Sequence, residues 1–173
     1  MATHAPDLLI DFLQTREADE DVFATAEGLA SWMAERGLVP PGTQPSEADL
    51  TRVRHVRAAL RALFGSHGSS DLDERTRATL ERVTEEAPLM VRFAAGSLSL
   101  QPQAEGIAAG LARIVSLLYD AHRDGTLARY KTCKKCGWAF YDESKNRSRV
   151  WCDMALCGSQ IKAASYRARK KSG

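Results

Sequence analysis

The chain has 173 residues, of which 44% are hydrophobic and 27% charged, and this composition is typical of a globular protein. No apolar run approaches the roughly 18 residues that a membrane span needs, which excludes a membrane-spanning helix. The N-terminal segment soon becomes acidic and has neither the basic start nor the apolar stretch of a secretory signal. We therefore expect a cytoplasmic protein with no membrane partner.

The two parts of the chain carry opposite charge. Residues 1–128 contain 12 arginines, no lysine and 19 acidic residues, for a formal charge of −7. Residues 129–173 contain 12 basic and 3 acidic residues, for a charge of +9, and they hold every lysine and every cysteine of the chain. This change of sign predicts two units with different partners, divided at residues 128 and 129.

Apolar spacing predicts that residues 1–128 form a mainly helical domain with one small β-hairpin, an α+β fold. Residues 8–13 indicate a short apolar turn. Asp21 is then expected to cap a helix that runs to Arg36, with Gly37 as its C-terminal cap.

A second helix is predicted to begin at Ser46, after the loop at residues 40–45 that prolines and a glycine interrupt. One side of this helix carries Arg54, Arg57 and Arg61 at spacings of three and four. Such a stripe suits an anion, but a solvated helix face is the simpler interpretation.

Three further elements complete this unit. A helix is expected from about residue 71 to before Pro88, a hairpin of alternating apolar residues over 89–100, and a final helix over 104–123 that Gly125 ends. The unit contains no metal-binding histidine pattern, phosphate loop or nucleophile motif, so we expect no enzymatic activity. The histidines on the predicted helices, His55 and His122, are interpreted as surface or packing residues.

The four cysteines have the spacing of a metal site, C-x2-C, then fifteen residues, then C-x4-C. Zinc binds four thiolates at the corners of a tetrahedron, and Gly137 can adopt the positive φ that such a knuckle needs. A shell closed by four cysteines leaves no position for water, so the pattern predicts one structural zinc ion held by Cys133, Cys136, Cys152 and Cys157.

Disulfides, a redox pair and an iron–sulfur cluster are the alternatives to zinc. A cytoplasmic location disfavours disulfides. A redox C-x-x-C motif would not need the second pair of cysteines. An iron–sulfur cluster is compatible with four cysteines and stays open.

Around the cysteines the sequence predicts a strand at residues 138–141, a polar turn at 142–148 and a return strand at 149–151. Cys157 is then expected to start a helix over residues 157–170. A knuckle, a hairpin and a helix that bears the last ligand are in the order of a treble-clef-like zinc finger. We expect its aromatic residues to pack around the metal rather than stack on bases.

Further residues around the cysteine pairs form a recognisable pattern: Phe140, Asp142, Ser144, Asn146, Arg149, Trp151, Met154 and Gly158. This pattern resembles the CGNR zinc finger. In that family the finger follows an N-terminal ABATE domain, which begins with a segment similar to residues 8–13. The family is described as stress-induced transcriptional regulators with the finger as the DNA-binding part, and the resemblance implies the same role here. The family's motif has Asn and Arg where this chain has Ser159 and Gln160.

Basic residues of the finger are predicted to form the nucleic-acid-binding surface, because a phosphate backbone attracts clustered cations. They lie in the polar turn, the return strand and the last predicted helix: Lys145, Arg147, Arg149, Lys162, Tyr166, Arg167, Arg169, Lys170 and Lys171. Since one finger makes a small interface, we expect a homodimer or a second contact to add affinity.

RNA and an acidic protein surface are the alternative partners. Binding to an acidic protein would make the chain a protein-interaction adaptor. In either case the N-terminal unit would serve sensing, dimerisation or partner binding.

Overall fold

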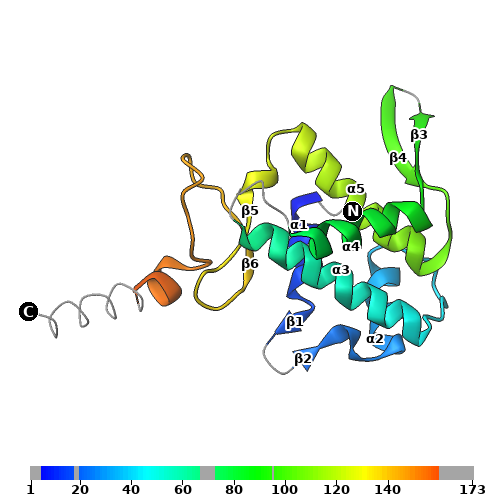
Figure 1. The fold of residues 1–173 in the computed structure, drawn as a ribbon, viewed down its shortest axis with the longest axis horizontal. Helices are drawn as coiled ribbons and strands as arrows, with labels where there is room; N and C mark the ends of the chain where they lie inside the picture. The colour runs from blue at the N-terminus through cyan, green and yellow to red at the C-terminus, as the bar shows by residue number, and fades with distance from the viewer. Residues whose placement is uncertain (1–4, 18–19, 67–72, 95, 160–173) are drawn as a thin grey trace, which may run out of the picture.

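The structure is a computed structural model that describes residues 5–17, 20–66, 73–94 and 96–159 (Figure 1). The helices and strands follow one another as α1 (Ala5–Gln14), β1 (Arg16–Glu17), β2 (Glu20–Asp21), the 3-10 turn η1 (Val22–Ala24), α2 (Ala26–Glu35), α3 (Glu47–Gly65), α4 (Glu74–Glu86), β3 (Leu89–Ala94), β4 (Ser97–Pro102), α5 (Gly106–Arg123), the 3-10 turn η2 (Leu127–Arg129), β5 (Tyr130–Thr132), β6 (Ala139–Tyr141) and the π-helical turn η3 (Met154–Gly158). Within these ranges the strands form three antiparallel pairs, β1–β2, β3–β4 and β5–β6.

The main apolar core lies among α1, α2, α3 and α5. Phe12, Phe23 and Trp32 contact one another there, with ring centroids 5.4 to 5.7 Å apart. Aliphatic side chains that are at most 1% exposed fill the space around these rings: Leu9, Leu13, Leu29, Met33, Val53, Leu50, Leu60, Leu111 and Ile114. The predicted mainly helical fold with small hairpins is confirmed. None of the described helices combines the length and the apolarity needed to cross a membrane.

Capping residues set most helix ends where the sequence predicts them. Ser46 and Asp49 form a capping box at the start of α3, in which each side chain accepts the other's backbone N–H. Gly37 and Gly125 follow α2 and α5 with φ angles of 66°, a left-handed conformation that favours glycine. Helix α4 begins at Glu74, after its cap Asp73, about three residues later than predicted.

Two elements near the N-terminus differ from the prediction. Residues 8–13 lie inside α1, a ten-residue helix whose Leu9, Phe12 and Leu13 are fully buried, and do not form a turn. Asp21 caps only the short turn η1, and Thr25 caps α2 separately. The predicted long helix is interrupted because Thr25 has an extended backbone, with φ −125° and ψ 154°.

The predicted hairpin is confirmed, and it projects from the helical body (Figure 1). Its strands β3 and β4 pair from Leu89 with Pro102 to Ala94 with Ser97. The paired Phe93 and Leu98 are 83% and 63% exposed, and Val91 on the same face is 51% exposed. The hairpin thus presents an apolar face to solvent.

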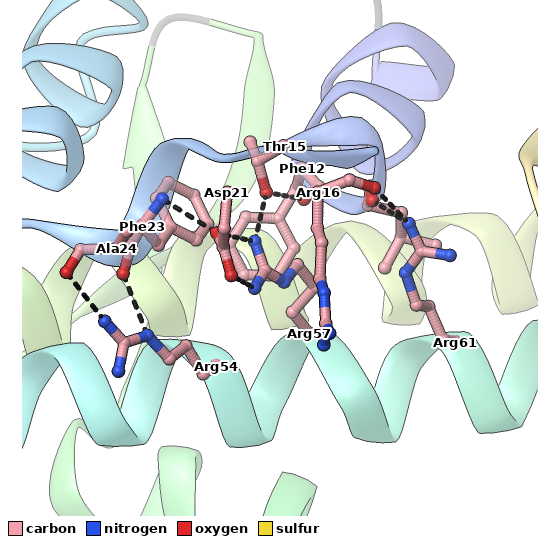
Figure 2. Close-up of polar contacts among 10 residues, drawn as sticks. Phe12, Thr15, Arg16, Asp21, Phe23, Ala24, Arg54, Arg57 and Arg61 are labelled. Atoms are coloured by element: carbon pink, nitrogen blue, oxygen red, sulfur yellow. Dashed lines mark hydrogen bonds and ion pairs between the residues drawn. The ribbon is translucent and has the colours of Figure 1, made fainter. Parts of the chain in front are cut away.

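The arginine stripe of α3 is neither a solvated face nor an anion site, because all three guanidinium groups bind the end of α1 or the segment between α1 and α2 (Figure 2). Arg57 is 3% exposed and donates to both Asp21 carboxylate oxygens, at 2.7 and 2.5 Å, and to the Thr15 hydroxyl at 2.9 Å. Arg54 donates to the Phe23 carbonyl at 2.8 Å. Burial raises the pKa of Asp21, but the hydrogen bonds from Arg57 and from the Phe23 N–H outweigh it, and the pKa lies below its usual value.

The strands β5 and β6 pack onto the helical domain. Tyr130 stacks on Phe64 of α3, with centroids 5.2 Å apart, and Tyr141 meets Tyr130 edge-on at 5.0 Å. Ala139 is fully buried in the main core, and its carbonyl accepts from Gln14 Nε2 at 3.0 Å. The cysteine-bearing segment therefore starts from a hairpin that shares the core of the helices.

Candidate metal centre and basic surface

The four cysteines meet at one point. One sulfur from each of Cys133, Cys136, Cys152 and Cys157 lies within 4.8 Å of all the others. Cys136 and Cys152 are 3.6 Å apart, Cys152 and Cys157 3.8 Å, and Cys157 and Cys136 3.7 Å, measured between sulfurs. A tetrahedron with metal–sulfur bonds of about 2.3 Å has edges of about 3.8 Å, so these separations fit a tetrahedral zinc ion.

The first cysteine pair sits in a tight turn between β5 and β6. The Gly137 N–H donates to the Cys133 carbonyl at 2.9 Å, and the Cys133 N–H donates to the Trp138 carbonyl at 2.8 Å. Gly137 has a φ of 73°, as the knuckle requires. Arg61 of α3 donates to the Gly137 carbonyl at 2.9 Å, which ties the knuckle to the helical domain.

The second cysteine pair is held without the predicted return strand. Residues 149–151 form no strand, and β6 pairs with β5, because the two segments that flank the knuckle turn are already antiparallel and adjacent. One backbone hydrogen bond, from the Lys134 N–H to the Val150 carbonyl at 3.0 Å, joins this segment to the knuckle. Cys157 lies in η3, which Asp153 caps by accepting from the Leu156 N–H. The predicted helix over 157–170 lies outside the described residues from residue 160 on.

The environment of the thiols suits a cation. Burial raises the pKa of Cys133, but backbone hydrogen bonds from Cys136, Cys152 and Lys135 outweigh it and lower the pKa to about 6. Burial, together with the neighbouring cysteines, raises the pKa of Cys152. Four sulfurs this close therefore ionise together only if a positive ion lies among them, and zinc supplies that charge.

Aromatic residues pack around the cysteines, as predicted. Phe140 is 8% exposed and forms a small cluster with the half-buried Trp138 and Trp151 and with the cysteine sulfurs. A module this small has few other apolar side chains to surround a metal ion.

A buried ion pair, which the sequence analysis missed, holds the loop between the cysteine pairs. Lys131 Nζ donates to Asp142 Oδ2 at 2.7 Å and to the carbonyls of Arg147 and Arg149 at 2.5 and 3.0 Å. Asp142 is fully buried and also accepts from the backbone N–H groups of Ser144 and Arg149. Burial raises the pKa of Asp142, but hydrogen bonds from Lys131, Ser144 and Arg149 outweigh it and keep the pKa well below its usual value. The sequence pointed to this ion pair only through Asp142, which is one of the residues of the pattern around the cysteine pairs.

The predicted nucleic-acid-binding residues divide into three groups. Lys145 and Arg147 are exposed on the loop that the Lys131–Asp142 pair holds. Arg149 is half-buried, donates to the Cys152 carbonyl at 2.6 Å and lies over the Phe140 ring, so its guanidinium group braces the finger. The other six lie outside the described residues: Lys162, Tyr166, Arg167, Arg169, Lys170 and Lys171. The knuckle adds two exposed lysines that were not among the predicted residues, Lys134 and Lys135.

A helical domain that carries a closed tetrahedral site of four cysteines defines this chain as a zinc-finger protein. Comparison with protein families agrees and is more specific. Residues 129–170 match the CGNR zinc finger, and residues 7–121 match the ABATE family, which is described as "Putative stress-induced transcription regulator". The chain belongs to the ABATE family and carries a CGNR zinc finger at its C-terminal side. No curated protein matched the chain in a sequence search.

Proposed function

We propose that this chain is a DNA-binding transcriptional regulator, without enzymatic activity, that acts in the cytoplasm. The finger supplies the DNA contact, and the helical domain supplies sensing, dimerisation or partner binding. The observation that carries this proposal is the distribution of charge. The helical domain is acidic, at −7 over residues 1–128, whereas residues 129–173 carry +9. An acidic body repels a phosphate backbone and a basic finger attracts it, so DNA would meet the finger first.

The loop after β6 is well built for contact with phosphates. Lys145 and Arg147 of this loop are exposed. The backbone between them is fixed by Lys131, which donates hydrogen bonds to the Asp142 carboxylate and to the Arg147 carbonyl. A loop fixed in this way loses little conformational entropy on binding. Arg129, Lys131 and Arg149 are occupied inside the finger and are not counted as DNA contacts.

The test is fluorescence anisotropy of the zinc-loaded chain with random duplex DNA over a series of salt concentrations. Each phosphate contact contributes a slope of about 0.9 in the logarithmic plot of affinity against salt. The Lys145→Gln/Arg147→Gln variant should bind more weakly and lose about two units of slope. Arg92→Gln/Arg123→Gln, which removes the same charge from the helical domain, is the matched control and should bind like the parent chain.

Three results would contradict the proposal. Absence of binding at low salt with one zinc ion per chain would favour the protein-interaction adaptor. Stronger binding to structured RNA than to duplex DNA would favour an RNA-binding protein. Equal losses in the finger variant and in the control would mean that binding follows net charge and not the finger surface.

A further inference from the structure

A groove of about 830 Å³ runs between α3 and α4 of the helical domain. Its size is within the range of about 300 to 1,000 Å³ that is typical of sites for small molecules. The floor consists of side chains that are at most 6% exposed, Val56, Ala59, Thr76 and Val83. Five of the other eleven lining residues are alanines or threonines, and these small side chains leave space in the groove.

The two carboxylates in the lining are already bound within the protein. Asp73 accepts from the Thr76 N–H at 3.0 Å and from the Thr76 hydroxyl at 2.6 Å. Glu86 accepts from Arg52 Nε at 2.9 Å. Glu86 is therefore already paired with a cation, and Asp73 is held by Thr76 at the N-terminal end of α4.

Three nitrogen-bearing side chains of the lining are exposed and make no hydrogen bond or ion pair with any described residue: His55, Arg75 and Arg82. Arg77, on the outer side of the same helix, is different because it forms ion pairs with Glu74 and Glu81. Residues 1–128 contain 19 acidic residues and 12 arginines, so the domain as a whole is acidic. The unpaired arginines at the groove carry the opposite charge. Arginine binds a planar carboxylate with two parallel hydrogen bonds.

We propose that this groove binds a small organic acid. The carboxylate is bound by Arg75 or Arg82, with His55 as a further donor, and the apolar body lies on the floor made by Val56, Ala59 and Val83. Arg75 and Arg82 are two helical turns apart, about 10 Å along α4, so one of the two is the principal contact. The groove would be the site at which the helical domain senses a ligand, whether or not the finger binds DNA.

The test uses the full zinc-loaded chain, labelled with nitrogen-15, in NMR titrations with three probes. Octanoate carries both a carboxylate and an apolar body, 1-octanol carries only the body, and inorganic phosphate carries only the charge. Octanoate should shift backbone amides of α3 and α4 to saturation. The other two should bind at least about tenfold more weakly, since each lacks one of the two contributions. No saturable shift with octanoate, shifts that centre on the β3–β4 hairpin instead, or equal binding of either partial probe would overturn the proposal.

Variants then locate the carboxylate. Arg75→Gln or Arg82→Gln should weaken octanoate binding about tenfold, the loss expected for hydrogen bonds to a charged group. Arg77→Gln, which changes the outer face of α4, should bind octanoate like the parent chain. Thr79→Trp, which places a large side chain in the groove, should abolish binding while the protein stays folded. Unchanged affinity in both arginine variants would overturn the proposal.

The DNA measurement separates this inference from the proposed function. Arg75→Gln and Arg82→Gln should bind random duplex DNA like the parent chain in the absence of any acid. If they lose DNA affinity instead, the groove arginines contact phosphates, and the organic acid is overturned as their ligand. If DNA binding fails altogether, the octanoate titration still stands by itself.

Discussion

Buried cations with several oxygen partners are the residues that organise this molecule. Arg57 bridges α3 to Asp21 and Thr15, and Lys131 bridges β5 to Asp142 and two loop carbonyls. In each case a carboxylate balances the charge and further oxygens complete the hydrogen bonds, which is what burial of an ion requires. Each cation thereby fixes a segment that has little regular structure of its own.

The first prediction compares two arginines of one helix. Arg57→Met should lower the free energy of unfolding by about 3 to 5 kcal/mol, because it leaves the Asp21 carboxylate without its buried partner. Arg54→Met removes hydrogen bonds to two carbonyls of a less buried group, at a cost of about 1 kcal/mol each at most. Urea unfolding of the zinc-loaded variants measures both values. Similar small losses would mean that the Arg57 side chain is solvated after all.

The β3–β4 hairpin carries four of the eight large apolar side chains that are exposed among the described residues. It is a two-stranded sheet, and such sheets are marginal by themselves. Leu89 and Pro102 pair at the end nearest the helices, whereas Phe93 and Leu98 pair near the exposed tip. The apolar tip therefore contributes little to the folding of the chain.

This exposure gives the second prediction. Phe93→Ser/Leu98→Ser should lower the free energy of unfolding by about 1 kcal/mol or less, the value of one cross-strand pair. Val83→Ser, at a site that is 4% exposed, should cost at least about 2 kcal/mol and serves as the comparison. Thermal unfolding followed by circular dichroism gives both numbers. A large loss in the hairpin variant would show that the tip is covered in solution.

The sequence predicted elements well where local chemistry decides them. Ser46 with Asp49, and the glycines Gly37 and Gly125, set helix ends through contacts within a few residues, and the alternation from Leu89 to Leu100 identified the hairpin. The cysteine spacing identified the metal site for the same reason.

Features that depend on distant partners were not predicted. Arg57 is separated by 36 residues from Asp21, and Arg61 by 76 from the Gly137 carbonyl, so nothing in the helical stripe revealed that these side chains point inward. Residues 149–151 were expected to pair with β6 because they follow it, but β5 is nearer to β6 in space. A local pattern cannot rank two such partners, since the choice depends on tertiary packing.

At the scale of the whole molecule, the finger and the helices form one body. Tyr130 and Ala139, which flank the zinc knuckle, belong to the same apolar core as Phe64 and Leu13. Gln14 of α1 donates a hydrogen bond to the Ala139 carbonyl of β6, and Arg61 of α3 donates one to the Gly137 carbonyl of the knuckle turn. The orientation of the knuckle toward the helices is therefore set by packing and not by a linker.

The third prediction follows from this shared core. Scanning calorimetry of the zinc-loaded chain should give one unfolding transition, and a chelator should lower the melting temperature of that whole transition. Structural zinc contributes on the order of 10 kcal/mol to small fingers, and the shared core passes part of that loss to the helices. Cys157→Ser should reproduce the effect of the chelator. Two transitions, with the larger one insensitive to chelation, would mean that the helical domain folds independently of the finger.

The shared core has a consequence for the amount of protein in a cell. If the metal leaves, the finger unfolds and the β5–β6 hairpin is disturbed. Phe64 and Tyr130, which stack on each other, then become exposed to solvent. Chains with exposed apolar residues are removed by proteases, and a loss of 1 to 2 kcal/mol changes abundance about severalfold. The zinc concentration would then set the cellular concentration of this protein. Low zinc would lead to degradation of the whole chain instead of accumulation of a folded chain that lacks a working finger.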